Sequence, residues 1–156
     1  MDTTHPLFSL QEFQVEDSVG YLLKRTRAML VNTVDETLSE QGYEITQAQG
    51  SLLFMLSTGK YRTAADLVRE ICIDAASMKR MIDRLVAHGL ILRVPSAQDR
   101  RVKTLHLTPK GEELSAEIWR VAGRLRSELL RDIPLDEVER SMALLSQLHR
   151  RLEQLQ

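Results

Sequence analysis

The segment 63–107 constrains the fold most, because two short helix signals stand directly before two short strand signals. Thr63 and Asp66 have the spacing of a capping box, in which side chains and backbone amides at a helix start satisfy one another. Asp74 is a good N-cap for a second helix, and Gly89 can adopt the left-handed conformation that ends it. Two short helices joined by a tight turn have the proportions of a helix-turn-helix.

Two apolar and β-branched runs follow this helix pair, from Ile91 to Val94 and from Val102 to Leu107. Such runs predict short strands, and the polar residues 95–101 between them predict a turn. We therefore expect the two strands to form a hairpin directly after the second helix.

Apolar residues at helical spacing account for most of the remaining chain. Thr46 and Gln49 form another capping-box pattern, which predicts a short helix to about Ser57. The longer predicted helices cover about residues 17–41, residues 109–132 and the stretch after Pro134. The fold class we expect is mainly α with a small β-hairpin, in one domain that spans residues 1–156.

Composition excludes several classes of protein. Hydrophobic residues make up 43% and charged residues 28%, as in ordinary globular chains, and no stretch approaches the ~20 apolar residues of a membrane span. The N-terminus has no signal-peptide pattern, and the single cysteine, Cys72, fits a reducing compartment. Neither a nucleotide-binding glycine pattern nor metal-ligand histidine spacing occurs. We expect a cytoplasmic protein without a cofactor, a metal or membrane contact.

Positive charge is concentrated in the middle of the chain, although the whole chain has a net charge of −1. Residues 60–110 hold eleven Lys and Arg against five Asp and Glu, which gives +6 there and −7 elsewhere. A positive centre between negative flanks suggests one face for a polyanion. The alternative is a chance cluster of solvated charges.

The predicted helix 75–87 has two distinct faces. Met78, Ile82 and Leu85 lie at i, i+4 and i+7, which predicts that they face the core. Small residues at a helix start let the backbone approach a surface closely, and the amide groups there favour a phosphate. The outer side carries small and charged residues, namely Ala75, Ala76, Lys79, Arg80 and Asp83, with Ser77 near the helix start.

This outer side has the composition of a helix that reads the major groove of DNA. Ser77 can donate or accept a hydrogen bond, while Lys79 and Arg80 can reach guanine edges or phosphates. An ordinary amphipathic helix with a solvated basic face is the alternative.

Two adjacent arginines, Arg100 and Arg101, lie at or beside the tip of the predicted hairpin, with Asp99 before them. Exposed tips seldom need two neighbouring like charges for stability, because surface ion pairs contribute only ~0–1 kcal/mol. An arginine there can enter a narrow minor groove, and Asp99 can orient Arg101 through a charge-assisted hydrogen bond. A reading helix followed by a basic hairpin is the winged helix-turn-helix arrangement, and a solvated β-turn is the alternative.

The motifs after the reading helix form a recognisable set. Asp99 and Arg101 form an acidic-x-Arg wing, which leads into a strand and then Leu-Thr-x-x-Gly at residues 107–111. Together with the Met-Ile-Asp-Arg-Leu run at 81–85, they resemble the multiple-antibiotic-resistance regulator (MarR) family over roughly residues 17–153. The resemblance implies a homodimeric transcriptional regulator, usually a repressor, that binds a pseudo-palindromic operator in double-stranded DNA. It also implies release by a small aromatic or phenolic ligand, or by oxidation.

The resemblance assigns roles position by position and also shows departures. The family's reading-helix and wing positions are occupied by Ser77, Lys79, Arg80, Asp99 and Arg101. Ala75 and Ala76 replace the longer polar residues of many members, which leaves the base preference open. Members that sense peroxide have their reactive cysteine in the first long helix, where this chain has none. Cys72 is therefore expected to be a small buried filler.

The last predicted helix has apolar residues at mixed three- and four-residue spacing over about five turns. A lone small domain would thereby expose more apolar surface than monomers usually tolerate. Packing the first and last helices of two chains together would bury it and set two reading helices near 34 Å apart, about one DNA turn. We expect residues 17–41 and 109–156 to form the dimer and residues 46–108 to bind DNA. The alternative is that these apolar residues pack only against the chain's own first and fifth helices.

A cleft between the dimerisation and DNA-reading parts could bind an effector. Aromatic walls with a cation would suit a carboxylated aromatic ligand, although single aromatic residues at helical spacing are usually core. A winged helix can also serve as a protein-interaction module without specific DNA binding. A small hydrolase or redox enzyme could use Cys72 or Ser57 as nucleophile, but no nearby histidine supports this. The candidate ligand residues are Tyr21, Lys24, Arg25, Tyr43 and Trp119.

Overall fold

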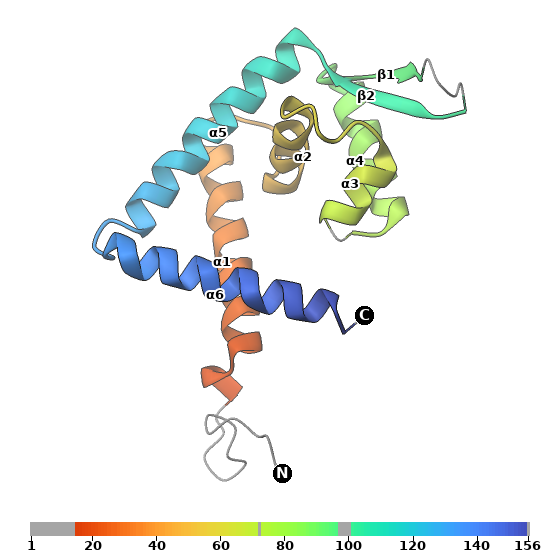
Figure 1. Ribbon diagram of the computed structural model, residues 1–156. Coiled ribbons are helices and arrows are strands. Elements are labelled where there is room, and N and C mark those ends of the chain that lie inside the picture. Colours follow the sequence, from red (N-terminus) through yellow and green to blue (C-terminus); the bar gives the residue numbers. More distant parts are fainter. Residues whose placement is uncertain (1–14, 72, 97–100, 156) are drawn as a thin grey trace. The chain divides into compact units, whose positions relative to one another are not determined.

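The computed structural model describes residues 15–71, 73–96 and 101–155 (Figure 1). A single hairpin in the described part joins β1 (Ile91–Pro95) to β2 (Lys103–Leu107). The expected fold class, mainly α with a small β-hairpin, is confirmed. The described helices are η2 (Val15–Asp17, a short 3-10 helix), α1 (Val19–Glu40), α2 (Gln47–Ser57), α3 (Ala64–Ile71), α4 (Ala75–Ala87), α5 (Pro109–Leu129) and α6 (Leu135–Glu153).

The chain forms two compact units, residues 1–119 and 120–156, and the division falls within α5. The first unit contains α1 to α4, the hairpin and the start of α5. The second unit contains the end of α5 and all of α6. Among the described helices, none has the length and apolar character that crossing a membrane requires.

Several boundaries differ from the sequence prediction by one to three residues, and two of them have a clear physical cause. Helix α5 ends at Leu129 rather than near Asp132, because the chain closes in tighter i→i+3 hydrogen bonds there, including one from the amide of Arg131 to the carbonyl of Glu128 at 3.3 Å. Strand β1 continues to Pro95, and a proline can end an edge strand because its missing N–H is not needed there.

Side-chain caps start the helices where the sequence predicts them. At α2, the hydroxyl of Thr46 accepts from the amide of Gln49 at 3.3 Å, and the Gln49 side chain accepts from the amide of Thr46 at 2.9 Å. At α3, the same exchange joins Thr63 and Asp66 at 3.2 and 3.0 Å. At α4, the carboxylate of Asp74 accepts from the third amide of the helix. These caps satisfy amide groups that a helix start otherwise leaves without partners.

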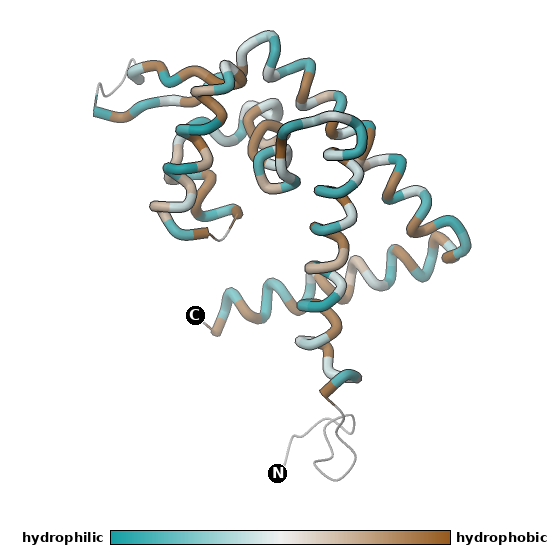
Figure 2. The backbone as a smooth tube through the Cα atoms, turned by 180° about the vertical axis from the view of Figure 1, so that it is seen from behind, coloured by the Kyte–Doolittle hydropathy of each residue, from teal (hydrophilic) through white to brown (hydrophobic). Residues whose placement is uncertain are grey.

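Apolar side chains from the helices and the hairpin form the core of the first unit. Figure 2 shows hydrophobic and hydrophilic residues alternating along each helix, which leaves one side of the helix free to pack inward. Within this unit α3 packs against α4, α4 against β1, and α2 against β2 and α1. The described side chains with 0% exposure are Leu38, Leu52, Leu53, Leu67, Met78 and Ile91.

The start of α5 is packed tightly against the end of α4. The hydroxyl of Thr108 donates to the carbonyl of Gly89 at 2.7 Å and accepts from the amide of Gly111 at 3.0 Å. A Cβ atom on Gly111 would lie 2.0 Å from the carbonyl oxygen of Leu90, so only glycine fits. Gly89 itself ends α4 with a φ of 67°, which other residues rarely adopt. The Leu-Thr-x-x-Gly motif therefore holds the end of the hairpin and the start of α5 against the end of α4.

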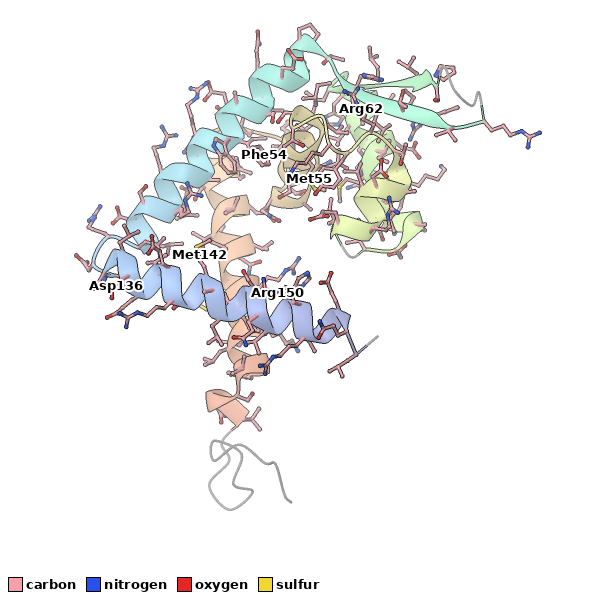
Figure 3. All side chains as sticks on the ribbon, viewed as in Figure 1. Phe54, Met55, Arg62, Asp136, Met142 and Arg150 are labelled. Carbon is pink, nitrogen blue, oxygen red and sulfur yellow. The ribbon has the colours of Figure 1, made fainter. Side chains whose placement is uncertain are left out.

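The hairpin is a regular antiparallel pair. Ile91 pairs with Leu107, and the register continues to Pro95 opposite Lys103. On its other edge, β2 gains a further hydrogen bond, because the amide of Leu105 donates to the carbonyl of Arg62 at 2.7 Å. Figure 3 labels Arg62 beside this strand. The loop between α2 and α3 thus ties the hairpin to the helix-turn-helix.

Candidate nucleic-acid interface

Helix α4 places its apolar side inward and its small and basic side outward, as predicted. Met78, Ile82 and Leu85 are 0%, 2% and 1% exposed. The outward positions Ala75, Ala76, Lys79 and Arg80 are all exposed. Alanines let the backbone come close to another surface, and the two cations flank them, Lys79 toward β1 and Arg80 toward α2. This surface has the shape and charge for insertion into a DNA groove.

Hydrogen bonds order the exposed start of α4. The carboxylate of Asp74 accepts from the amide of Ser77 at 2.8 Å, and the hydroxyl of Ser77 accepts from the guanidinium of Arg80 at 2.7 Å. The Ser77 hydroxyl and the amides of the first turn lower the pKa of Asp74, so this cap is charged near neutral pH. Ser77 and Arg80 are therefore positioned together before any partner binds.

One side of α4 is tied to the hairpin by a shared carboxylate. Asp83 accepts from Lys79 at 2.9 Å and from Arg93 of β1 at 2.5 Å. The hydrogen bond from Lys79 lowers the pKa of Asp83 the most, and the hydrogen bond from Arg93 lowers it further. We call these three residues the wing flank of α4. The i,i+4 spacing of Lys79 and Asp83 could have revealed the first pair, but Arg93 was not foreseen.

The other side of α4 borders a groove beside the start of α2. The groove has a volume of about 150 Å³. We call its basic α4 part, Ser77, Arg80 and Arg84, the α2 flank. Arg84 was missed by sequence reasoning, although its seven-residue distance from Ser77 places it on the same side of the helix. The groove is lined by Thr46, Gln49, Ser77, Arg80, Met81 and Arg84.

The wing carries further basic residues. Arg101 is exposed, and so are Lys103 on β2 and Arg93 on β1. Asp99 and Arg100 lie outside the described residues, so the predicted hydrogen bond between Asp99 and Arg101 remains a prediction.

The candidate ligand residues come from α1, the loop after it and α5. Tyr21 and Tyr43 are half-buried, whereas Lys24 and Arg25 are exposed. Trp119 stacks on Phe54 of α2, with ring centroids 4.1 Å apart and planes 3° from parallel. One face of the indole ring is thus already covered by the fold, while the whole residue is 48% exposed. Figure 3 labels Phe54 and its neighbour Met55 on α2.

The residues considered for catalysis gain no support from the structure. Cys72 lies outside the described residues. Ser57 is exposed at the end of α2, where its hydroxyl donates to the carbonyl of Phe54 at 2.7 Å. Among the residues that the structure describes, no group of His, Cys, Asp and Glu could hold a metal ion.

Helices α1 and α6 carry large apolar side chains that the single chain leaves exposed. On α6, no described side chain is buried, and Leu135 and Met142 are 73% and 63% exposed. Figure 3 labels Met142 on this helix. Monomers rarely expose so many apolar residues on adjoining turns. The exposed apolar residues of the two helices are Val19, Leu22, Leu23, Met29, Leu30, Leu135, Met142, Leu144, Leu145 and Leu152.

A helix-turn-helix with an exposed basic reading helix, followed by a basic hairpin, defines a winged helix-turn-helix protein of the DNA-binding class. Comparison with known proteins agrees with this class. Residues 45–103, which contain α2 to α4 and β1, match the model of the MarR family. This segment of the chain is therefore similar to the DNA-binding part of MarR-family winged helix-turn-helix regulators.

Solved structures are similar over most of the chain. A cysteine-to-serine mutant of MarR from E. coli, in complex with operator DNA, is 26% identical, with a TM-score of 0.76 over 87% of this chain and 99% of that one. The S. aureus MepR–DNA complex is 23% identical, with a TM-score of 0.77 over 92% of this chain and 100% of that one. Bordetella bronchiseptica BpsR, whose DNA binding is regulated by 6-hydroxynicotinic acid, is 24% identical, with a TM-score of 0.76 over 88% of this chain and 96% of that one. The last two similarities show the fold alone.

Proposed function

We propose that the protein is a cytoplasmic, homodimeric repressor that binds a pseudo-palindromic operator and is released by a small aromatic ligand. The observation that carries this proposal is the orientation of α4. Its apolar residues Met78, Ile82 and Leu85 are buried, so that Ala75, Ala76, Lys79 and Arg80 face outward together. A helix with this outer face can lie in the major groove with its first turn close to the bases.

The DNA contacts divide between the reading helix and the wing. Ser77 and Arg80 contribute to base reading, because a hydroxyl and a guanidinium can both bond to base edges. Lys79 contributes charge toward the phosphates. In the wing, Arg101 enters or borders the minor groove, with Asp99 and Arg100 beside it.

Dimerisation is supported by the exposed apolar residues of α1 and α6. Burying them between two chains would remove apolar surface from water, at roughly 25 cal/mol per Å². A two-fold axis then gives two reading helices about one DNA turn apart, near 34 Å, which explains why a two-fold symmetric operator is expected. In this proposal residues 17–41 and 109–156 form the dimer, while residues 46–108 contact DNA.

An effector is supported by BpsR, whose DNA binding 6-hydroxynicotinic acid regulates. We propose a related aromatic acid as effector, bound by Tyr21, Lys24, Arg25, Tyr43 and Trp119. A ligand that binds better to a dimer with misplaced reading helices lowers operator affinity by shifting the population toward that state.

Selection of bound genomic fragments, followed by footprinting, tests the function. We expect enrichment of one sequence with two-fold symmetry, protected on both half-sites, and sedimentation as a dimer. Equal binding to all duplexes, or none at low salt, would instead indicate a protein-interaction module. Screening aromatic acids for loss of the footprint would then identify the effector.

A further inference from the structure

The groove between α2 and α4 has the size for a small group rather than for a drug-sized effector. Its volume of about 150 Å³ is below the ~300–1,000 Å³ of typical ligand pockets. It opens beside Ser77 and Arg80, which belong to the surface proposed to contact DNA. Its occupant must therefore be small and must fit at the edge of a protein–DNA interface.

The lining of the groove is cationic. Arg80 and Arg84 contribute two guanidinium groups, and no carboxylate occurs among the described lining residues. Within the described part of the chain, no ion pair joins either arginine to an acidic side chain. A guanidinium presents a planar set of donors that matches the oxygens of a phosphate or carboxylate. The groove is therefore suited to an oxyanion.

The positive character comes from the arginines rather than from the start of α2. The amide of Gln47 donates to the carboxylate of Asp35 on α1, and the amide of Gln49 donates to the Thr46 hydroxyl. These first-turn amides already have acceptors. Arg80 is held at the groove by its 2.7 Å hydrogen bond to Ser77, so one of the two cations is fixed in place.

We propose that this groove seats one backbone phosphate of the bound DNA, with Arg84 as the additional contact residue. The inference rests on the proposed DNA binding by α4 and extends it to the α2 flank. Phosphates line both edges of the major groove, so a helix lying in that groove meets one beside it. The contact would fix the depth and register of α4 without reading sequence. Free inorganic phosphate has the same chemistry, and the experiment must separate the two sources.

Gln49→Glu is the sharpest variant, because it adds a negative charge to the groove without removing a cation. Glutamate serves at least as well as glutamine at this position of a capping box, so α2 should keep its stability. We expect binding to a random-sequence duplex at low salt to weaken about tenfold. Gln47→Glu is the matched control, since it adds the same charge to the same turn outside the groove lining. It should change binding by less than about threefold.

Arg84→Gln provides a second, independent measurement. It should weaken binding to random and selected duplexes by a similar factor, about tenfold, and reduce the salt slope by about one per subunit. Arg69→Gln is its control, because Arg69 on α3 pairs with Asp66 outside the groove. Thermal melts and circular dichroism establish that each variant is folded.

The outcomes separate this inference from the function on which it rests. If the wild-type protein binds no duplex, the proposed function and this inference both fail. If the wild type binds but Gln49→Glu and Arg84→Gln bind equally well, only the phosphate seat is wrong. The last measurement compares the melting temperature in inorganic phosphate with that in chloride at equal ionic strength. Stabilisation by phosphate that Arg84→Gln abolishes, with DNA binding unaffected, would assign the groove to a free anion instead.

Discussion

The two flanks of α4 both carry cations but differ in the groups that these cations bind. On the wing flank, one carboxylate, Asp83, is shared by Lys79 and Arg93, and it links the reading helix to β1. On the α2 flank, Arg80 and Arg84 border an open groove, and Arg80 is held by a neutral hydroxyl. On the wing flank one carboxylate offsets one of two positive charges, whereas among the described residues no ion pair offsets Arg80 or Arg84.

This difference predicts which flank of α4 contributes more to DNA affinity. A cation that is already paired must exchange its carboxylate for a phosphate, so its net gain on binding DNA is small. Arg80 is hydrogen-bonded to a hydroxyl and attracts Asp74 without an ion pair to it, so we expect it to gain more on binding a phosphate. We therefore expect the wing flank mainly to orient the hairpin and the α2 flank mainly to bind DNA.

The largest effect is expected from Arg80→Gln. Arg80 faces the outer surface and borders the groove, so in the proposed dimer its loss removes a base contact and a phosphate contact from each subunit. With ~1–3 kcal/mol per bidentate contact and two subunits, we expect about a 100-fold loss of affinity for the selected operator. Fluorescence anisotropy titration at fixed salt measures it, and Arg69→Gln controls for the change in net charge. A loss below about threefold would contradict the assignment of affinity to the α2 flank.

Arg101→Ala should have the next largest effect. If the wing lies along the minor groove, its loss weakens binding to all sequences by about tenfold and lowers the salt slope by about one per subunit. Gel-shift titrations at several salt concentrations measure both quantities. Unchanged binding would remove the wing from the mechanism and leave α4 alone as the DNA-binding element.

Much of this comparison could be predicted from the sequence, because it depends on local spacing. The i, i+4, i+7 pattern of Met78, Ile82 and Leu85 oriented α4 correctly, and the caps at Thr46 and Asp74 placed two helix starts. Helical periodicity thus fixed which residues face outward.

The rest depends on how elements meet in space. Asp83 and Arg93 are ten residues apart, and their contact exists only because β1 turns back along α4. The groove needs α2 placed against α4, and the Phe54–Trp119 stack joins α2 to α5. No local pattern encodes such pairings, since many other pairs of residues would have been equally compatible with the sequence.

Lys79→Gln gives a direct test of charge compensation on the wing flank. In the wild-type background we expect only about a threefold loss of DNA affinity, because Asp83 already neutralises Lys79. In an Asp83→Asn background the same change should lower DNA affinity about tenfold, since Lys79 is then free to bind phosphate. A double-mutant cycle by anisotropy measures the coupling. Equal losses in both backgrounds would mean that Asp83 does not restrain Lys79.

The smallest effect concerns the acid stability of the wing flank. The pKa of Asp83 is lowered in the folded protein by Lys79 and Arg93, so its stabilising contribution is present above the unfolded pKa of about 4 and is lost as the pH falls through the lower folded value. At pH 7, Asp83→Asn should therefore melt at a slightly lower temperature than the wild type.

As the pH falls below about 4, the two melting temperatures should converge, because a protonated Asp83 resembles asparagine. Asp83→Glu keeps the charge and should melt more like the wild type at pH 7. Thermal melts from pH 7 to pH 3 measure the difference. A gap between wild type and Asp83→Asn that stays constant over this range would show that packing, and not the charge shared between α4 and β1, connects the wing to the reading helix.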